Sequence, residues 1–330
     1  MRNIFKKYNS AKLIIILLFN FVGLQGNGFS QTSKSDKEEQ IEIQEDTIRV
    51  DTNLVTIPTT VFDREGRYVT NMRKEDFQVF EDGVEQKIEL FETVEQPFTV
   101  LLLLDVSGSM ATNIGELTRA ANTFVSRLRP DDQIIAATFD DTFNVVLKST
   151  KISNLNKSLK LRPRSGIHAT MLYDAVYDAL KMIKKVRGRK AIILFSDGMG
   201  EGTFGSAKGN LQNAEENEAL IYTVQFSNSF TVLPKGFDKE QFYKGVETAD
   251  NYMRDLASIT GGRPYKMENI ADLEKTFGLI ADELRQQYSL GYYPKEIEKG
   301  QKKQVRQIKV KVNQLNLAVR ARSSYVIEKK

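Results

Sequence analysis

The chain has no cysteine among its 330 residues and only one histidine, His168. It can therefore form neither a disulfide nor a thiolate metal site, and it offers no cysteine for a lipid anchor after a leader. A single histidine gives little support to zinc chemistry or to a histidine-dependent catalytic triad. The phosphate-loop pattern Gly-x-x-x-x-Gly-Lys-Ser/Thr and the nucleophile elbow Gly-x-Ser-x-Gly are also missing.

The first thirty residues have the pattern of an export signal. Four basic residues precede an apolar segment, Leu13–Leu24, which is shorter than the roughly 20 residues needed to span a bilayer. Residues 28–30, Gly-Phe-Ser, then offer the small side chains that a signal peptidase reads. We expect residues 1–30 to be a signal peptide and the protein to be periplasmic, cell-surface or secreted in a bacterium. An uncleaved leader is the alternative and would be its membrane contact.

Charge is balanced once the leader is set aside. The leader contains four of the 47 basic residues and none of the 43 acidic ones, which leaves 43 of each sign. This balance argues against nucleic acid or an anionic surface as a partner. Residues 31–46 are polar without any periodicity, which predicts a disordered linker.

Short β-strands are predicted at both ends of the remaining chain. In residues 47–96, the dipeptide Asp82-Gly83 between two strand-like runs is a strong hairpin signal. Residues 286–330 contain three more predicted strands, at 287–293, 305–312 and 317–327. Neither group is large enough to stand alone, so we expect the two to pair into one small, discontinuous β-sandwich. Two separate β pieces are the alternative.

Residues 97–285 alternate apolar strands with amphipathic helices, which predicts an α/β domain with a doubly wound, mostly parallel sheet. The predicted strands are 98–105, 133–139, 191–196, 219–226 and 263–267, with an antiparallel edge at 145–148. The predicted helices are 114–128, 170–186, 251–260 and 270–287.

The most informative motif ends the first of these strands. Asp105, Ser107 and Ser109 alternate along one loop, and their oxygens are the hard donors that suit Mg²⁺ or Mn²⁺. Thr170 begins a predicted helix and Asp197 ends another apolar strand, so both are expected at the same edge of the sheet. The alternative for the first loop is a plain strand-to-helix turn with Ser109 as the N-cap.

This pattern resembles the metal-ion-dependent adhesion site of the von Willebrand factor type A domain, over roughly residues 97–285. Segments 79–88, 173–176 and 287–294 extend the resemblance to a group of secreted bacterial proteins labelled "VWFA-related". One departure stands out, because the family often has Gly-Gly before the threonine, whereas this chain has His168-Ala169.

The resemblance implies a role for each matching residue. Ser107, Ser109 and Thr170 would approach the ion directly or nearly so. Asp105 and Asp197 would support it, often through water. A carboxylate from a partner would complete the octahedron.

Three weaker signals have two interpretations each. His168 could orient a ligand, or it could be a rim residue without a dedicated role. Asp140-Asp141 could support the metal, although we favour a solvated turn. The pattern Gly-x-Gly-x-x-Gly at 200–205 comes late in the sheet and after an aspartate, so we favour a flexible loop over a nucleotide site.

These observations favour a metal-dependent protein-binding or adhesion module without enzymatic activity. A Mg²⁺ or Mn²⁺ ion would capture an Asp or Glu carboxylate of a protein or glycan ligand. A metal-dependent hydrolase is the first alternative, although no general base with an activated neighbour is evident at the rim. A structural envelope component with a stabilising metal is the second.

Overall fold

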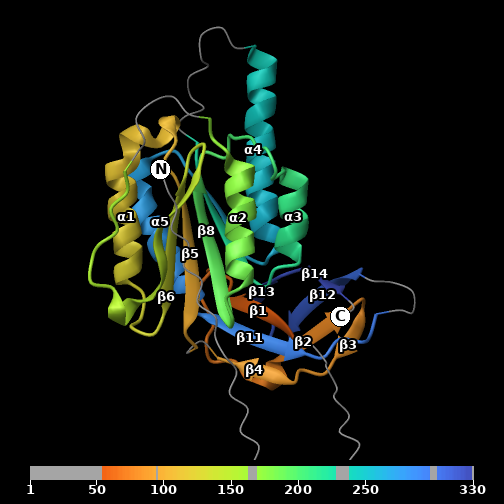
Figure 1. Cartoon of the computed structure of the whole chain (residues 1–330). Coiled ribbons are helices and arrows are strands. Elements are labelled where there is room, and N and C mark those ends of the chain that lie inside the picture. The colour runs from red at the N-terminus through yellow and green to blue at the C-terminus, as the bar shows by residue number, and fades with distance from the viewer. Residues whose placement is uncertain (1–53, 94–95, 163–168, 228–237, 298–302, 329–330) are drawn as a thin grey trace, which may run out of the picture. The chain divides into compact units, whose positions relative to one another are not determined.

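A computed structural model describes residues 54–93, 96–162, 169–227, 238–297 and 303–328 (Figure 1). The expected signal peptide (1–30) and linker (31–46) lie outside the described residues, and so does His168. None of the helices in the described ranges combines the length and the apolar character needed to cross a membrane.

A six-stranded sheet occupies the middle of the chain, with the strand order β10-β9-β8-β5-β6-β7. Its strands are β5 (Phe98–Asp105), β6 (Gln133–Phe139), β7 (Phe143–Lys151), β8 (Arg189–Ser196), β9 (Leu220–Phe226) and β10 (Pro264–Met267). All neighbours are parallel except β7, which pairs antiparallel with β6. The continuous apolar run of β5 is buried along its whole length because helices cover both faces. The predicted doubly wound sheet is confirmed.

The helices cover the sheet in two groups (Figure 1). One face carries α1 (Ile114–Ser126) and α5 (Leu273–Leu284), and the other carries α2 (Leu172–Lys184), α3 (Ala207–Glu215) and α4 (Lys239–Ile259). Successive side chains of β5 point to opposite faces, so Leu102 joins the first core and Leu103 joins the second.

The second helix group is larger than the sequence pattern predicts. No helix is expected at α3, and only residues 251–260 are expected within α4. Both helices begin with a side-chain cap, because Ser206 and Asp238 each accept a hydrogen bond from a backbone amide three residues further on. Gly209 and Gly245 lie inside these helices and weaken the helical signal.

Both ends of the described chain contribute to two antiparallel four-stranded sheets, ordered β13-β1-β11-β4 and β14-β12-β2-β3. The strands are β1 (Val55–Phe62), β2 (Phe77–Glu81), β3 (Val84–Gln86), β4 (Leu90–Glu92), β11 (Gln287–Tyr292), β12 (Lys303–Val312), β13 (Ala318–Ala321) and β14 (Ser324–Glu328). Strand β1 lies between β11 and β13, and β2 pairs with β12. Each sheet therefore combines strands from the two ends, as the sandwich prediction requires.

The predicted strand at 317–327 is wrong as a single element. It divides into β13 and β14, which belong to different sheets. Arg322 lies at the division, is 5% exposed, and donates from Nε to the carbonyl of Ser324 at 2.7 Å. The predicted hairpin is present, with positive φ angles at Asp82 (47°) and Gly83 (83°) between β2 and β3.

A buried polar network joins the sandwich to the α/β part. Glu283, at the end of α5, is 0% exposed and accepts a hydrogen bond from the Tyr222 hydroxyl at 2.8 Å. It also forms an ion pair with Arg320 of β13. Gln287, the first residue of β11, donates to the Tyr222 hydroxyl at 2.9 Å. A buried carboxylate needs such partners, so this network fixes where α5 ends relative to the sandwich.

Candidate metal centre

Asp105 is the last residue of β5 and is 0% exposed, so it lies deeper than the loop position that the sequence suggested. One of its carboxylate oxygens accepts from the backbone amide of Ser107 at 2.9 Å, and the other accepts from the Ser196 hydroxyl at 2.7 Å. Ser196 ends the neighbouring strand β8. These two hydrogen bonds fix the orientation of the carboxylate at the carboxyl end of the sheet.

The two serines of the motif lie at the start of a short 3-10 helix, Gly108–Asn113. Their Oγ atoms are 3.3 Å apart, with Ser107 buried and Ser109 exposed. The alternative interpretation of Ser109 as an N-cap is wrong, because Ser109 lies inside this helix and the cap position belongs to Ser107, whose side chain makes no capping hydrogen bond. Neither hydroxyl is used for capping here.

Thr170 is brought to the same edge by backbone hydrogen bonds on both sides. Its carbonyl accepts from the amide of Glu201 at 2.8 Å, and the next residue, Met171, donates to the carbonyl of Asp140 at 2.8 Å. Asp140 follows β6, while Glu201 lies in the loop after β8. Thr170 is half-buried, and its hydroxyl has no hydrogen-bond partner within the described ranges. The segment therefore lies between the ends of the strands that flank β5.

Asp197 follows β8 directly and is 4% exposed. Its Oδ1 accepts from the amide of Met199 at 2.9 Å, which orients the carboxylate within a tight turn. Gly198 takes a φ of 84° in this turn, a conformation that favours glycine. Burial, together with the neighbouring charge of Asp197, raises the pKa of Asp105 to about 7.

The donor set fits a hard divalent cation. The charge of Asp197 disfavours the ionisation of Asp105, and a cation between the two carboxylates would relieve that repulsion. Among the described residues, no three His, Cys, Asp or Glu side chains gather closely enough to hold a metal ion. A metal here would therefore depend on the hydroxyls of Ser107, Ser109 and Thr170 as well as on Asp105 and Asp197.

The glycine pattern at 200–205 has a packing explanation. A Cβ at Gly200 would lie 2.8 Å from the carbonyl oxygen of Thr170, and one at Gly205 would lie 2.3 Å from that of Tyr173. Only glycine lets this loop approach the start of α2 so closely. The loop therefore supports the Thr170 segment, a role that differs from both the flexible loop and the nucleotide site considered from sequence.

Asp174 is a positioning residue that sequence analysis missed. It lies in the first turn of α2, is 7% exposed, and accepts hydrogen bonds from the backbone amides of Thr203, Phe204 and Gly205 at 2.6–3.0 Å. A carboxylate with three amide donors holds the loop against the helix that begins beside Thr170. No local sequence pattern signals this contact, since the partners are about thirty residues apart.

Replacing Asp174 by alanine should destabilise the folded chain by about 2 kcal/mol, because three backbone amides lose a charged acceptor. Asp178→Ala is the matched control on the same helix, since Asp178 has no hydrogen bond among the described residues. Urea unfolding of the two variants measures the difference. Equal midpoints would contradict the anchoring role.

Asp140 is 2% exposed, so the favoured interpretation of a solvated turn is wrong for this residue. Its carboxylate accepts from the amide and the hydroxyl of Thr142, at 2.9 and 3.0 Å. Asp140 thus stabilises the turn between β6 and β7 beside the candidate centre. Asp141 is half-buried.

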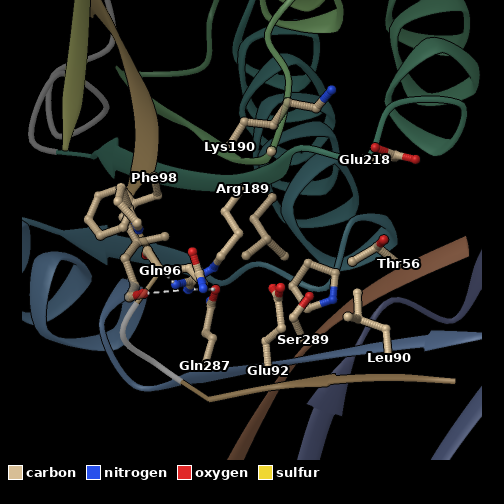
Figure 2. A pocket seen from close by; sticks show the side chains of 15 residues that line it. Thr56, Leu90, Glu92, Gln96, Phe98, Arg189, Lys190, Glu218, Gln287 and Ser289 are labelled. Atoms are coloured by element: carbon tan, nitrogen blue, oxygen red, sulfur yellow. Dashed lines mark hydrogen bonds between the residues drawn. The ribbon is translucent and has the colours of Figure 1, made fainter. Parts of the chain in front are cut away.

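A cavity of about 340 Å³ lies at the opposite end of the sheet (Figure 2). It is lined by Phe98 and Arg189, the first residues of β5 and β8, and by sandwich residues such as Glu92. Arg189 crosses it and donates to the carbonyl of Gln96 at 3.0 Å. Because ligands of open α/β sheets bind at the carboxyl ends of the strands, we place the candidate centre at Asp105 and not here.

Several solved structures have a similar fold at low sequence identity. BatB from Bacteroides thetaiotaomicron is 16% identical over 57% of this chain and 97% of its own, with a TM-score of 0.38. A von Willebrand factor type A protein from Catenulispora acidiphila is 10% identical over 84% and 75%, with a TM-score of 0.43. Proximal thread matrix protein 1 from the mussel byssus, solved with a zinc-occupied MIDAS motif, is 15% identical over 63% and 50%, with a TM-score of 0.47.

No curated protein matches the chain. The family profile of the von Willebrand factor type A domain matches residues 99–278, which is more than half of the chain and spans all of the six-stranded sheet except Phe98. The chain belongs to the von Willebrand factor type A domain family.

Proposed function

We propose that this protein is an exported, cation-dependent binding module. A Mg²⁺ or Mn²⁺ ion would be held by the hydroxyls of Ser107, Ser109 and Thr170, with Asp105 and Asp197 supporting it mainly through water. The ion would supply a Lewis-acidic position for a carboxylate oxygen of an Asp or Glu on a protein or glycan partner. Membership of a family whose domains mediate protein–protein interactions supports this proposal.

The observation that carries the proposal is that the charged and the neutral donors differ in their exposure to solvent. The two carboxylates are buried and already hydrogen-bonded, whereas the exposed donor, Ser109, is a neutral hydroxyl. Neutral ligands leave most of the positive charge on a bound cation. A cation held in this way attracts an incoming anion more strongly than one neutralised by carboxylates.

Loss of the Thr170 hydroxyl should weaken partner binding more than it weakens the fold. The experiment is affinity capture from a bacterial envelope extract, using wild type, Thr170→Ala and the control Thr118→Ala. Thr118 lies on α1 and its hydroxyl bonds only its own helix, to the carbonyl of Ile114 at 2.7 Å. We expect capture by wild type and by the control in Mg²⁺, and loss of capture in Thr170→Ala or with chelator.

Undiminished capture by Thr170→Ala, or by wild type in chelator, would show that the rim is not the recognition surface. Loss of capture in the control Thr118→Ala as well as in Thr170→Ala would mean that the loss is not specific to the Thr170 hydroxyl. Thermal melts of the same samples separate loss of binding from loss of fold.

We also propose that the module is not an enzyme. The titratable groups assigned to the metal are Asp105 and Asp197, and each carboxylate is held by amide or hydroxyl donors. A hydrolase needs a base with access to water in addition to an ion. Metal-dependent turnover of a phosphoester or peptide substrate that Asp197→Asn abolishes would overturn this part of the proposal and favour the hydrolase.

Export is a further part of the proposal and is supported by the leader pattern of residues 1–30. The mature protein would then begin at Gln31, with the linker to residue 46, the sandwich strands in 47–96 and 286–330, and the family domain in 97–285. Mass spectrometry of the protein from an envelope fraction gives the N-terminus directly. An intact Met1 would indicate the uncleaved anchor.

A further inference from the structure

A groove of about 340 Å³ lies beside the candidate metal centre. One wall is the loop that follows Asp197, including Met199 and Gly200, and the other wall is the amino-terminal half of α4, including Lys244 and Gly245. We call this feature the rim groove. It adjoins the centre through this loop, because Gly198 to Gly200 follow Asp197 directly and the next residue, Glu201, donates to the carbonyl of Thr170.

The floor of the rim groove is apolar. Met199 reaches across to α4, where a Cβ on Gly245 would lie 3.3 Å from its Cε atom. Ala249 and Tyr173 also line the groove. Thioether, methyl and aromatic surfaces of this kind accept an aliphatic or aromatic side chain without a fixed hydrogen-bond pattern.

Helix α4 gives the groove its outer wall. Figure 1 shows α4 extending well beyond α2 and α3 at the end of the sheet that carries the centre. Glycine in a helix interior is unfavourable, but at position 245 it leaves room for Met199 and keeps the groove open. Gly245, which weakens the helical pattern of α4 in the sequence, therefore leaves space for the groove.

A single charged side chain lines the rim groove among the described residues. It is Lys244, which is exposed and forms no ion pair within the described ranges. The hydroxyl of Thr248 donates to the carbonyl of Lys244 at 2.8 Å, so its proton is already used within the helix. An anionic segment with an apolar side chain is the complementary ligand.

We propose that the rim groove binds the side chains that neighbour the metal-bound carboxylate in the ligand's sequence. The ligand class is a peptide segment in which an Asp or Glu at the ion is followed within one or two positions by an aliphatic or aromatic residue, with a second acidic residue near Lys244. This inference rests on the proposed function, because the metal would anchor the segment whose neighbour enters the groove.

The test uses an array of hexapeptides, Gly-Xaa-Asp-Xaa-Xaa-Gly, with each Xaa position varied through all residues. The full chain is applied in Mg²⁺ and in chelator, as wild type, Gly245→Leu and Gly115→Leu. Gly245→Leu fills the groove. Gly115→Leu is the matched control in α1, where an added Cβ meets no atom within 4 Å.

We expect wild type and Gly115→Leu to retain peptides with Leu, Ile, Met or Phe beside the aspartate, in Mg²⁺ only. Gly245→Leu should bind these peptides at least tenfold more weakly than wild type in Mg²⁺. It should keep the Mg²⁺-induced rise in Tm, which would show that the metal centre is intact. Lys244→Glu should reverse the preference for a second acidic residue.

Two outcomes separate the groove from the metal. Acidic peptides that bind in Mg²⁺ without any preference for an apolar neighbour, or with a preference that Gly245→Leu leaves unchanged, would overturn the rim groove and leave the proposed function standing. No Mg²⁺-dependent signal for any acidic peptide, together with no Mg²⁺-induced Tm shift, would overturn the proposed function and this inference with it. A Mg²⁺-dependent dimer that Gly245→Leu dissociates would make a second copy of the chain the occupant.

Discussion

Asp105→Asn should abolish the stabilisation of this protein by Mg²⁺ while leaving the chain folded. In chelator we expect the variant to unfold within about 1 kcal/mol of wild type, because the amide keeps an acceptor for the Ser107 amide and a polar contact with Ser196. At a hundredfold excess of Mg²⁺ over Kd, wild type should gain about 2.7 kcal/mol, or about 5–10 °C in Tm. The variant should gain nothing.

The choice of asparagine follows from the burial of Asp105. Alanine would leave the Ser107 amide and the Ser196 hydroxyl without their acceptor in a site that is 0% exposed, so it would disturb the fold as well as the metal. Alanine would be a suitable choice at an exposed loop position, but the burial of Asp105 makes asparagine the better one.

Asp132→Asn is the control. Asp132 is also buried, at 1% exposure, and also accepts from backbone amides, those of Phe98 and Arg129, but it lies at the amino end of the sheet. Differential scanning calorimetry of the three proteins, with Mg²⁺ and with chelator, should show the shift in wild type and in Asp132→Asn only. An equal shift in Asp105→Asn would remove Asp105 from the metal centre.

The central sheet is predictable from sequence because its signals are local. The run Phe98–Asp105 is apolar at nearly every position, which is typical of a strand covered on both faces. The residues proposed for the metal follow from the same reasoning, since the carboxyl ends of neighbouring parallel strands meet at one edge. Asp105 and Ser196 are hydrogen-bonded across β5 and β8 for this reason.

The elements that sequence reasoning missed depend on contacts between distant residues. Gly245 weakens the helical signal of α4, and it gives room to the side chain of Met199, about forty-five residues earlier. The single predicted strand at 317–327 breaks because Arg322 turns inward, where its guanidinium bonds the carbonyls of Ser324 and Glu215. The role of Asp174 could not be predicted for the same reason, because its partners lie about thirty residues later in the sequence. The periodicity of apolar residues predicts which face of a helix or strand a residue lies on. It does not predict which distant part of the backbone that residue will contact.

Residues 47–96 expressed alone should be unfolded, although they contain four of the sandwich strands. In the whole chain β1 lies between β11 and β13, and its Ile57 and Val61 are 0% exposed. Their core is completed by Tyr288 and Leu290 of β11, both also 0% exposed. Without the C-terminal strands, β1 loses the hydrogen-bonded neighbours on both of its edges, and the apolar faces of the sheets are open to water.

The measurement is an NMR correlation spectrum of labelled 47–96, alone and after mixing with unlabelled 97–330. Narrow amide dispersion and no cooperative melt are expected for the fragment alone. The mixture should give dispersed peaks, because β11, β12 and β13 restore the register seen between the two ends. A dispersed spectrum and a cooperative melt for the isolated fragment would mean that its strands form a stable unit by themselves. The α/β part would then be attached to a complete β domain, and the buried pairings of β1 would be an interface between domains instead of the inside of one.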